Sequence, residues 1–279
     1  MTLSIEALEA RRAALEAELG EPITVDGLTA TFRIFQRKKG HRHSTDDLLT
    51  AWYALEMSPP VTRALDLGTG IGTVGLLVLA GMPDGMRLTC IEAQDVSFRF
   101  LGENLRANGV EDRVLAIHGD LRDLAHAERF PLVTGSPPYF DVSAGIVPAD
   151  SQKAHARFEL RGDVSDYARA AKRHLEDDGL FVLCFPWPQK ARALAALRGE
   201  GFVVSRHRDV VPRVGLTPLF SLFACRLAAP TATAPAALSD EIEEPPFVVR
   251  NEDGSHTAAM HDVRARFGWP PSRGPEGSP

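Results

Sequence analysis

The stretch ALDLGTGIG at positions 64–72 decides the fold of this chain. Residues 64–67 are typical of a buried strand, and a helix is expected from Thr73. The glycines at 68, 70 and 72 let the backbone turn sharply between the two and approach a ligand closely. The pattern leaves the ligand open, because residues 70–75 (GIGTVG) also fit the GxGxxG fingerprint of dinucleotide-binding proteins.

Acidic residues follow at the ends of three successive predicted strands. Asp66 precedes the first glycine, Glu92 ends the next strand (LTCIEA), and Asp120 follows the third (LAIHGD). The separations of 26 and 28 residues each fit one strand and one helix, so the acids line up along the carboxyl edge of a parallel sheet. Glu92 can accept from ribose hydroxyls and Asp120 from an adenine amino group. Asp120 alone would equally suit a helix-capping aspartate.

A second motif, Ser136-Pro137-Pro138-Tyr139, follows the apolar run Phe130–Gly135. An amino group conjugated to an aromatic ring is a poor nucleophile, because its lone pair is delocalised. Acceptors at the Ser136 hydroxyl and the Pro137 carbonyl would each take one N–H and direct the lone pair towards a methyl donor. The prolines stiffen the loop, and Tyr139 can stack on a base. Alone, the motif would also suit a structural turn, but an NAD enzyme would not explain it. Together with the acids it favours S-adenosylmethionine (SAM) over NAD.

On these residues the chain resembles class I SAM-dependent amino-methyltransferases, which carry [N/D/S]PP[Y/F/W]. It is most similar to the bacterial tRNA-1(Val) adenine-N6 methyltransferase family. Residues 44–52 (STDDLLTAW) resemble that family's TDxxLL segment, residues 136–140 (SPPYF) stand where it has NPPYF, and residues 156–159 (ARFE) resemble a stretch that follows. The likeness spans residues 24–227. It implies methylation of an exocyclic amino group of a base in RNA, with adenine N6 of a tRNA favoured.

The resemblance also implies roles for individual residues. Thr45 and Asp46 would close over the methionine end of SAM, although both also suit a helix cap. Arg157 would hold a phosphate or a loop carboxylate, although a lone arginine is more often a surface ion pair. The expected cofactor-binding set is Thr45, Asp46, Asp66, Gly68, Gly70, Gly72, Glu92 and Asp120.

The chain departs from the family at one position that bears on the choice of target base. The family normally has asparagine where this chain has Ser136, and serine is a shorter acceptor. SPP motifs also occur in cytosine-N4 DNA methyltransferases, so the base stays open. The alternatives are therefore a DNA amino-methyltransferase, a protein glutamine N5-methyltransferase with a similar NPPY site, an inactive SAM-binding scaffold and an NAD-dependent dehydrogenase.

Net charge and a local basic cluster bear on the partner. The chain has 279 residues and a net charge of -6, which argues against a broadly basic polyanion binder. Residues 33–43 nevertheless contain five Lys or Arg and two His, and next to a methyl-donor site they suit either nucleic-acid phosphate or solvent. The expected substrate-binding residues are Arg37, Lys38, Lys39, Arg42, Phe140 and Arg157.

Alternating strands and helices from residue 63 to 225 predict an α/β, Rossmann-like domain over residues 44–227. We expect a mostly parallel seven-stranded sheet, helices on both faces, and an antiparallel edge hairpin of residues 202–206 and 219–225. Residues 1–43 are expected to form a helix and a strand pair turning at Asp26-Gly27. A Pro/Ala-rich linker (228–246) and a small appendage with a disordered tail (247–279) follow.

Composition predicts a cytosolic protein without metal. Cys90, Cys184 and Cys225 stand in separate apolar segments at no metal-ligand spacing, as reduced core residues do. The first residues lack the apolar stretch of a secretory signal, and no apolar run is long enough to span a bilayer. The oligomeric state is not predicted.

Overall fold

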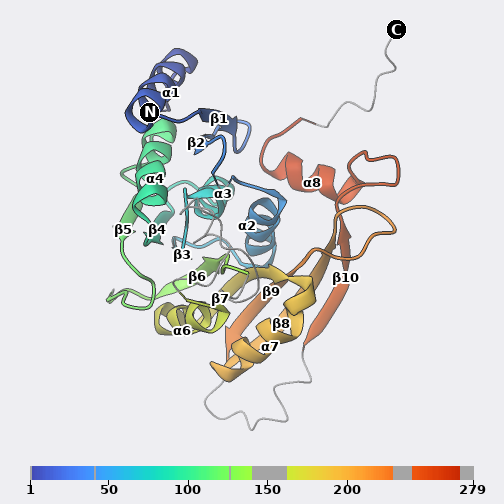
Figure 1. Cartoon of the computed structure of the whole chain (residues 1–279). Helices are drawn as coiled ribbons and strands as arrows, with labels where there is room; N and C mark the ends of the chain where they lie inside the picture. The colour runs from blue at the N-terminus through green and yellow to red at the C-terminus, as the bar shows by residue number, and fades with distance from the viewer. Residues whose placement is uncertain (1, 41, 126, 140–161, 229–240, 271–279) are drawn as a thin grey trace.

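The computed structural model describes residues 2–40, 42–125, 127–139, 162–228 and 241–270, and a twisted sheet forms its centre (Figure 1). The strands lie in the order β10-β8-β9-β7-β6-β3-β4-β5, and only β9 runs antiparallel to its neighbours. Their bounds are β3 Arg63–Leu67, β4 Arg87–Glu92, β5 Val114–His118, β6 Phe130–Gly135, β7 Leu175–Pro186, β8 Phe202–Val211, β9 Phe220–Leu227 and β10 Ile242–Val248.

Helices cover both faces of this sheet (Figure 1). Leu49, Leu76 and Phe100 pack into the core of one face, and they come from α2 (Thr45–Met57), α3 (Thr73–Gly81) and α4 (Asp95–Asn108). Tyr167 and Ala193 pack into the other, from α6 (Val164–His174) and α7 (Lys190–Gly199). The predicted α/β class, the mostly parallel sheet and the antiparallel pairing of β8 and β9 are confirmed, but the edge position of this hairpin is wrong, because β10 lies outside it.

The strand count is corrected from seven to eight, because β10 pairs in parallel with β8. Its residues 242–246 were expected to lie in the Pro/Ala-rich linker, and Pro245 and Pro246 have no N–H to donate to a neighbouring strand. An edge strand tolerates them, and the register shifts between Glu244 and Phe247, where they stand. Phe247 is buried with its ring centroid 5.1 Å from that of Trp52, so β10 seals the edge of the sheet.

The N-terminal strand pair turns later than predicted. β1 (Ile23–Gly27) runs antiparallel to β2 (Arg33–Arg37), so Asp26 and Gly27 lie inside a strand. Thr29 closes the actual turn, because its hydroxyl accepts from the Phe32 amide at 2.8 Å. The turn between β1 and β2 therefore lies at Thr29, where the side chain bonds the backbone, and not at the predicted Asp26-Gly27.

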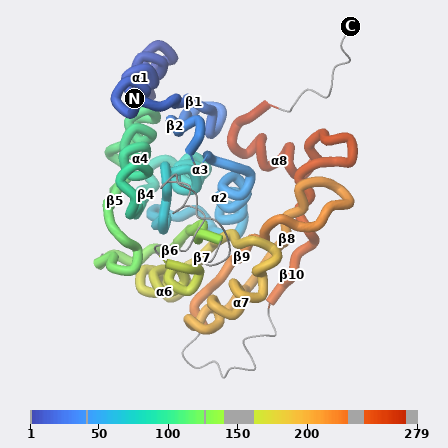
Figure 2. The backbone as a smooth tube through the Cα atoms, viewed as in Figure 1, coloured from blue at the N-terminus to red at the C-terminus, as the bar shows by residue number. Residues whose placement is uncertain are grey.

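Both terminal segments pack onto the domain. Following α1 (Ile5–Leu19), β2 is held on α4, where Asn104 Oδ1 accepts from the Phe35 amide at 2.6 Å. After β10, α8 (Ala258–Arg266) brings the Phe267 carbonyl within 3.0 Å of the Ala30 amide, so the chain runs back to the β1–β2 pair (Figure 2). The domain boundaries at 43 and 247 stay a prediction, and residues from both segments belong to one core. Within the described ranges, no helix has the length and apolar character to cross a membrane.

Candidate functional site

A pocket opens at the carboxyl edge of β3, β4 and β6, where the glycine-rich turn was predicted to bind a ligand. Gly68, Gly70 and Gly72 have φ of 59°, 60° and 95°, a region that residues with a Cβ rarely adopt. A Cβ on Gly68 would also lie 2.0 Å from the Tyr167 hydroxyl oxygen. The lining includes His43, Asp47, Asp66, Gly68, Thr69, Gly70, Ile71, Thr73, Glu92, Gln94, Asp120, Leu121, Ser136, Pro138 and Tyr167.

Asp66 holds this glycine turn in place. Its Oδ2 accepts from the Thr69 hydroxyl at 2.5 Å and the Gly75 amide at 3.0 Å, and its Oδ1 accepts from the Thr134 hydroxyl at 2.7 Å. Burial raises the pKa of the Asp66 carboxyl, and these hydrogen bonds lower it in part. Asp66 lines the pocket as predicted, but its oxygens are occupied in tying β3 to the start of α3 and to β6.

Glu92 and Asp120 lie in the same pocket, as their spacing predicts. Glu92 Oε2 accepts from the Gly70 amide at 2.8 Å and Oε1 from the Gln94 amide at 2.7 Å. The Asp120 carboxylate accepts from the Arg122 guanidinium at 2.9 and 2.7 Å. Both carboxylates are hydrogen-bond acceptors on the pocket lining. The hydroxyl and amino groups of an adenosine suit such a pair, and the residues present therefore fit SAM.

Residues Ser136–Tyr139, which we call the transfer loop, follow β6 at the side of the pocket. Ser136 Oγ lies 3.5 Å from Cys184 Sγ, and the Tyr139 hydroxyl lies 3.3 Å from the same sulfur. The Tyr139 ring meets Phe185 edge-on at 5.9 Å, and its carbonyl accepts from Gln189 Nε2 at 2.6 Å. The loop is therefore anchored on β7 and the segment after it. Its Ser136 and Pro138 line the pocket.

Cys184 on β7 contacts this loop, a position that the sequence did not predict. Burial raises the pKa of its thiol to about 12, so the group is neutral at physiological pH. A buried cysteine in an apolar strand is usually a core residue, and only the pairing of β7 beside β6 brings it under Ser136. We conclude that Cys184 is a polar neighbour of the transfer loop and no nucleophile.

The first turn of α2 lies near both the transfer loop and the pocket. Asp46 Oδ2 accepts from the Tyr139 hydroxyl at 2.9 Å, so Asp46 adjoins the transfer loop. Asp47, which was not among the predicted residues, lines the pocket, and burial raises the pKa of its carboxyl. Thr45 is exposed at the helix start, after the N-cap Ser44. The roles of Thr45 and Asp46 towards SAM stay predictions.

The predicted basic cluster divides into paired and exposed side chains. Arg37 Nε lies 2.6 Å from Glu21, and Arg42 Nη2 lies 3.1 Å from Asp26. Lys38 and Lys39 are exposed. His43 lines the pocket instead of belonging to the basic surface, and burial lowers its pKa. Phe140, Arg157 and the stretch 156–159 lie outside the described residues.

Tyr167 is a further pocket residue that the sequence did not predict. It stands on α6, its side chain is buried beneath Gly68, and it lines the pocket together with the three acids. Burial, followed by the charges of Glu92, Asp66 and Asp120, raises the pKa of its phenol well above the usual range. The phenol is therefore a neutral donor that faces the ligand space.

Tyr167→Phe is expected to weaken SAM binding by about fivefold to tenfold, because the pocket would lose a hydroxyl that could donate to the ligand. Titration calorimetry with SAM measures this. Tyr53→Phe is the matched control, because the Tyr53 hydroxyl donates to Glu244 at 2.7 Å, away from the pocket lining. Equal SAM affinity in Tyr167→Phe and the wild type would contradict the role of the phenol.

Comparison with known proteins agrees with this geometry. The model of the methyltransferase small domain matches residues 45–192, more than half of the chain. A tRNA1(Val) (adenine(37)-N6)-methyltransferase of Actinobacillus pleuropneumoniae serotype 7 is 23% identical over 74% of this chain and 81% of its own length. A protein of the same name from Histophilus somni is 25% identical over 67% of this chain and 77% of its own.

Solved structures support the fold. A predicted O-methyltransferase from Agrobacterium tumefaciens is similar with a TM-score of 0.61, at 20% identity, over 80% of this chain and 97% of that chain. A ribosomal protein methylase from Lactobacillus delbrueckii subsp. bulgaricus is similar with a TM-score of 0.52, at 14% identity, over 74% and 99%. The family model spans the glycine turn, the three acids and residues 136–139, and membership of a methyltransferase family supports SAM, not NAD, as the cofactor. The chain belongs to the methyltransferase small domain family and is a SAM-dependent methyltransferase.

Proposed function

We propose that this methyltransferase modifies an exocyclic amino group of a base in RNA, most specifically adenine N6 of a tRNA. The observation that carries the proposal is the position of Ser136 and Pro138 on the wall of the SAM pocket, at the end of β6. Relatives named as tRNA adenine-N6 methyltransferases, similar over three quarters of this chain, support the choice of substrate.

The surroundings of Ser136 explain how it can act as an acceptor. Its hydroxyl lies 3.5 Å from the neutral Cys184 thiol, so the serine proton can point to sulfur while the oxygen lone pairs face the pocket. The target N–H groups would donate to Ser136 Oγ and to the Pro137 carbonyl. Both acceptors are uncharged, so they orient the amino group without removing its proton beforehand.

SAM supplies an electrophilic methyl carbon when it is bound. Ser136 Oγ and the Pro137 carbonyl would hold the target nitrogen with its lone pair towards that carbon, and the proton that the nitrogen loses on transfer would pass to water. The contribution of the chain is orientation and proximity, which supply a large share of the rate in such transfers.

The proposal is tested with radiolabelled SAM and separate pools of tRNA, ribosomal RNA, DNA and protein, followed by nucleoside analysis of the labelled pool. We expect label in tRNA as N6-methyladenosine. Label in DNA, or label that survives nuclease but not protease, would replace the RNA substrate by a DNA base or a protein amide. SAM binding without transfer to any pool would contradict a transferase role altogether.

A further inference from the structure

Four exposed apolar side chains stand in the segment after β7 and in the loop between β8 and β9. Trp187, Val214, Leu216 and Leu219 are 37, 41, 57 and 59% exposed, although most large apolar side chains of the described residues are buried. Trp187 begins the short helix η2 (Trp187–Gln189), and the other three stand in the loop 212–219 between β8 and β9. We call these four residues the apolar rim.

Two residues of the apolar rim, Trp187 and Leu219, adjoin the segment that holds the loop Ser136–Tyr139. Trp187 follows β7, which pairs with β6, and neighbouring strands lie about 4.8 Å apart. Gln189, two residues further, donates to the Tyr139 carbonyl at 2.6 Å. The Trp187 amide in turn donates to the Leu219 carbonyl at 3.0 Å. A polymer with one residue in the transfer site would therefore reach the rim with its next residues.

Hydrogen bonds hold the rim in one conformation. Trp187 Nε1 donates to Asp209 Oδ2 at 3.0 Å, and the Leu219 amide donates to the Val210 carbonyl at 2.9 Å. The Val214 amide donates to the Arg250 carbonyl at 2.9 Å, in the segment that follows β10. The rim is thus a fixed surface, supported by the C-terminal residues that the family model does not cover.

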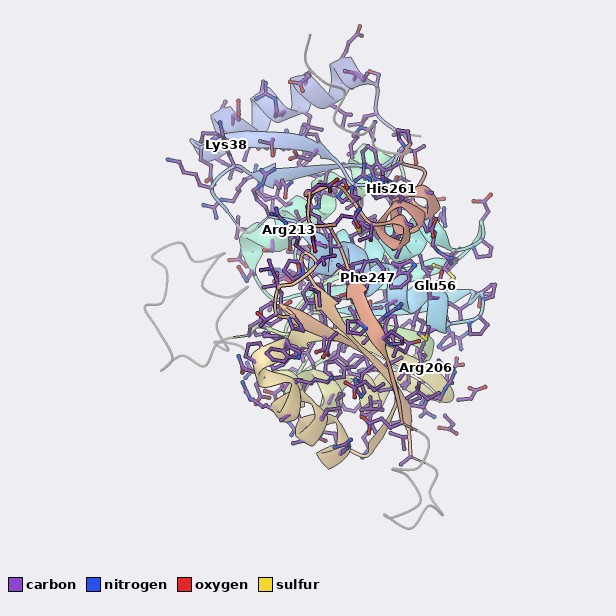
Figure 3. The ribbon with its side chains drawn as sticks, turned by 90° about the vertical axis from the view of Figure 1, so that its right-hand side faces the viewer. Lys38, Glu56, Arg206, Arg213, Phe247 and His261 are labelled. Carbon is purple, nitrogen blue, oxygen red and sulfur yellow. The ribbon has the colours of Figure 1, made fainter. Side chains whose placement is uncertain are left out.

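Positive charge adjoins this surface. Arg213 is exposed, and its positive charge helps to lower the pKa of the nearby Asp253 carboxyl. Figure 3 shows Arg213 at the end of the β8–β10 pair away from Arg206, on the side towards Lys38. An exposed aromatic ring with apolar neighbours and an exposed guanidinium can provide base stacking and phosphate contact for single-stranded nucleic acid.

We propose that the apolar rim and Arg213 bind the unpaired RNA nucleotides that flank the methylated base. The inference rests on the proposed RNA substrate and assigns this substrate a second contact surface. Bases pack on Trp187, Leu216 and Leu219, and Arg213 contacts a phosphate. A second copy of the chain is a poorer occupant, because four side chains are far fewer than the 20–30 residues per side of a stable protein interface.

The test compares tRNA binding by two variants with two matched controls. Leu216→Ser/Leu219→Ser removes apolar contact from the rim, and Leu115→Ser removes a side chain of similar exposure (51%) from β5 at the opposite edge. Arg213→Ala removes the charge, and Arg87→Ala removes an exposed arginine at the amino end of β4. Filter binding to unmodified tRNA over a range of salt gives the Kd, and calorimetry with SAM checks the fold.

The double leucine variant is expected to raise the tRNA Kd about fivefold to thirtyfold, with SAM affinity unchanged. Arg213→Ala is expected to reduce the slope of log affinity against log salt by about 0.7 to 0.9. Wild-type tRNA binding in both rim variants would overturn the inference, as would a change of oligomeric state in place of a change in tRNA affinity. A wild-type protein that methylates protein but no RNA would overturn the proposed function first, and the inference with it.

Discussion

Ser136→Ala is expected to lower kcat for methyl transfer about 100-fold or more while leaving the SAM Kd within about threefold. Ser136 lines the pocket and is the side-chain acceptor in the proposed mechanism, and the loss of one preorganised hydrogen-bonding group at a reacting centre typically costs a factor of 10² to 10³. SAM keeps its three acids and its glycine turn in this variant. Single-turnover kinetics with saturating SAM separates transfer from binding.

Ser136→Asn is the informative partner of that variant. Asparagine restores an acceptor with a longer reach, as in the relatives' usual motif, so partial activity is expected where alanine has almost none. A Ser136→Ala protein with normal turnover would refute the proposed role. So would a Ser136→Ala protein that lost SAM binding in proportion to its activity, because the serine would then serve the cofactor.

Asp66→Ala is expected to abolish measurable SAM binding and to lower the free energy of unfolding by about 2–5 kcal/mol. The reason is structural: the hydroxyls of Thr69 and Thr134 and the amide of Gly75 lose their acceptor in a buried site. Each unsatisfied buried donor costs about 1–3 kcal/mol, reduced where a donor finds another partner. Denaturant unfolding without ligand measures the stability.

Asp120→Ala separates the effect of a pocket carboxylate on protein stability from its effect on SAM affinity. Asp120 pairs with Arg122 at the surface, so its loss should change the free energy of unfolding by less than about 1 kcal/mol. SAM affinity should still fall. Equal destabilisation by Asp66→Ala and Asp120→Ala would contradict the view that Asp66 acts through the glycine turn and Asp120 on the ligand.

The sequence could place the three acids because parallel strands present their carboxyl ends at one edge. The positions of Asp66, Glu92 and Asp120 follow from where the strands end, and the spacing in the sequence predicts these ends. Tyr167 could not be found in this way, because it reaches the pocket from a helix on the far face. No pattern in α6 distinguishes a tyrosine that faces a ligand from one that faces the core.

Contacts between segments far apart in the chain could not be predicted from the sequence for a similar reason. The prolines at 245 and 246 argue against a central strand, and only the free edge of β8 makes β10 possible. The placement of Asp47, in place of Asp46, on the pocket wall depends on the rotation of α2 about its axis. Adjacent residues on a helix point about 100° apart, so a shift of one position changes which carboxylate meets the ligand.

The central claim is that this chain methylates adenine N6 in tRNA through Ser136. The most direct measurement is mass spectrometry of tRNA nucleosides from a source strain that lacks the gene for this chain, complemented with the wild type or with Ser136→Ala. The account predicts that N6-methyladenosine in tRNA falls in the deletion strain, returns with the wild type, and stays low with Ser136→Ala. An unchanged level of N6-methyladenosine in the deletion strain would contradict the substrate, and full restoration by Ser136→Ala would contradict the site.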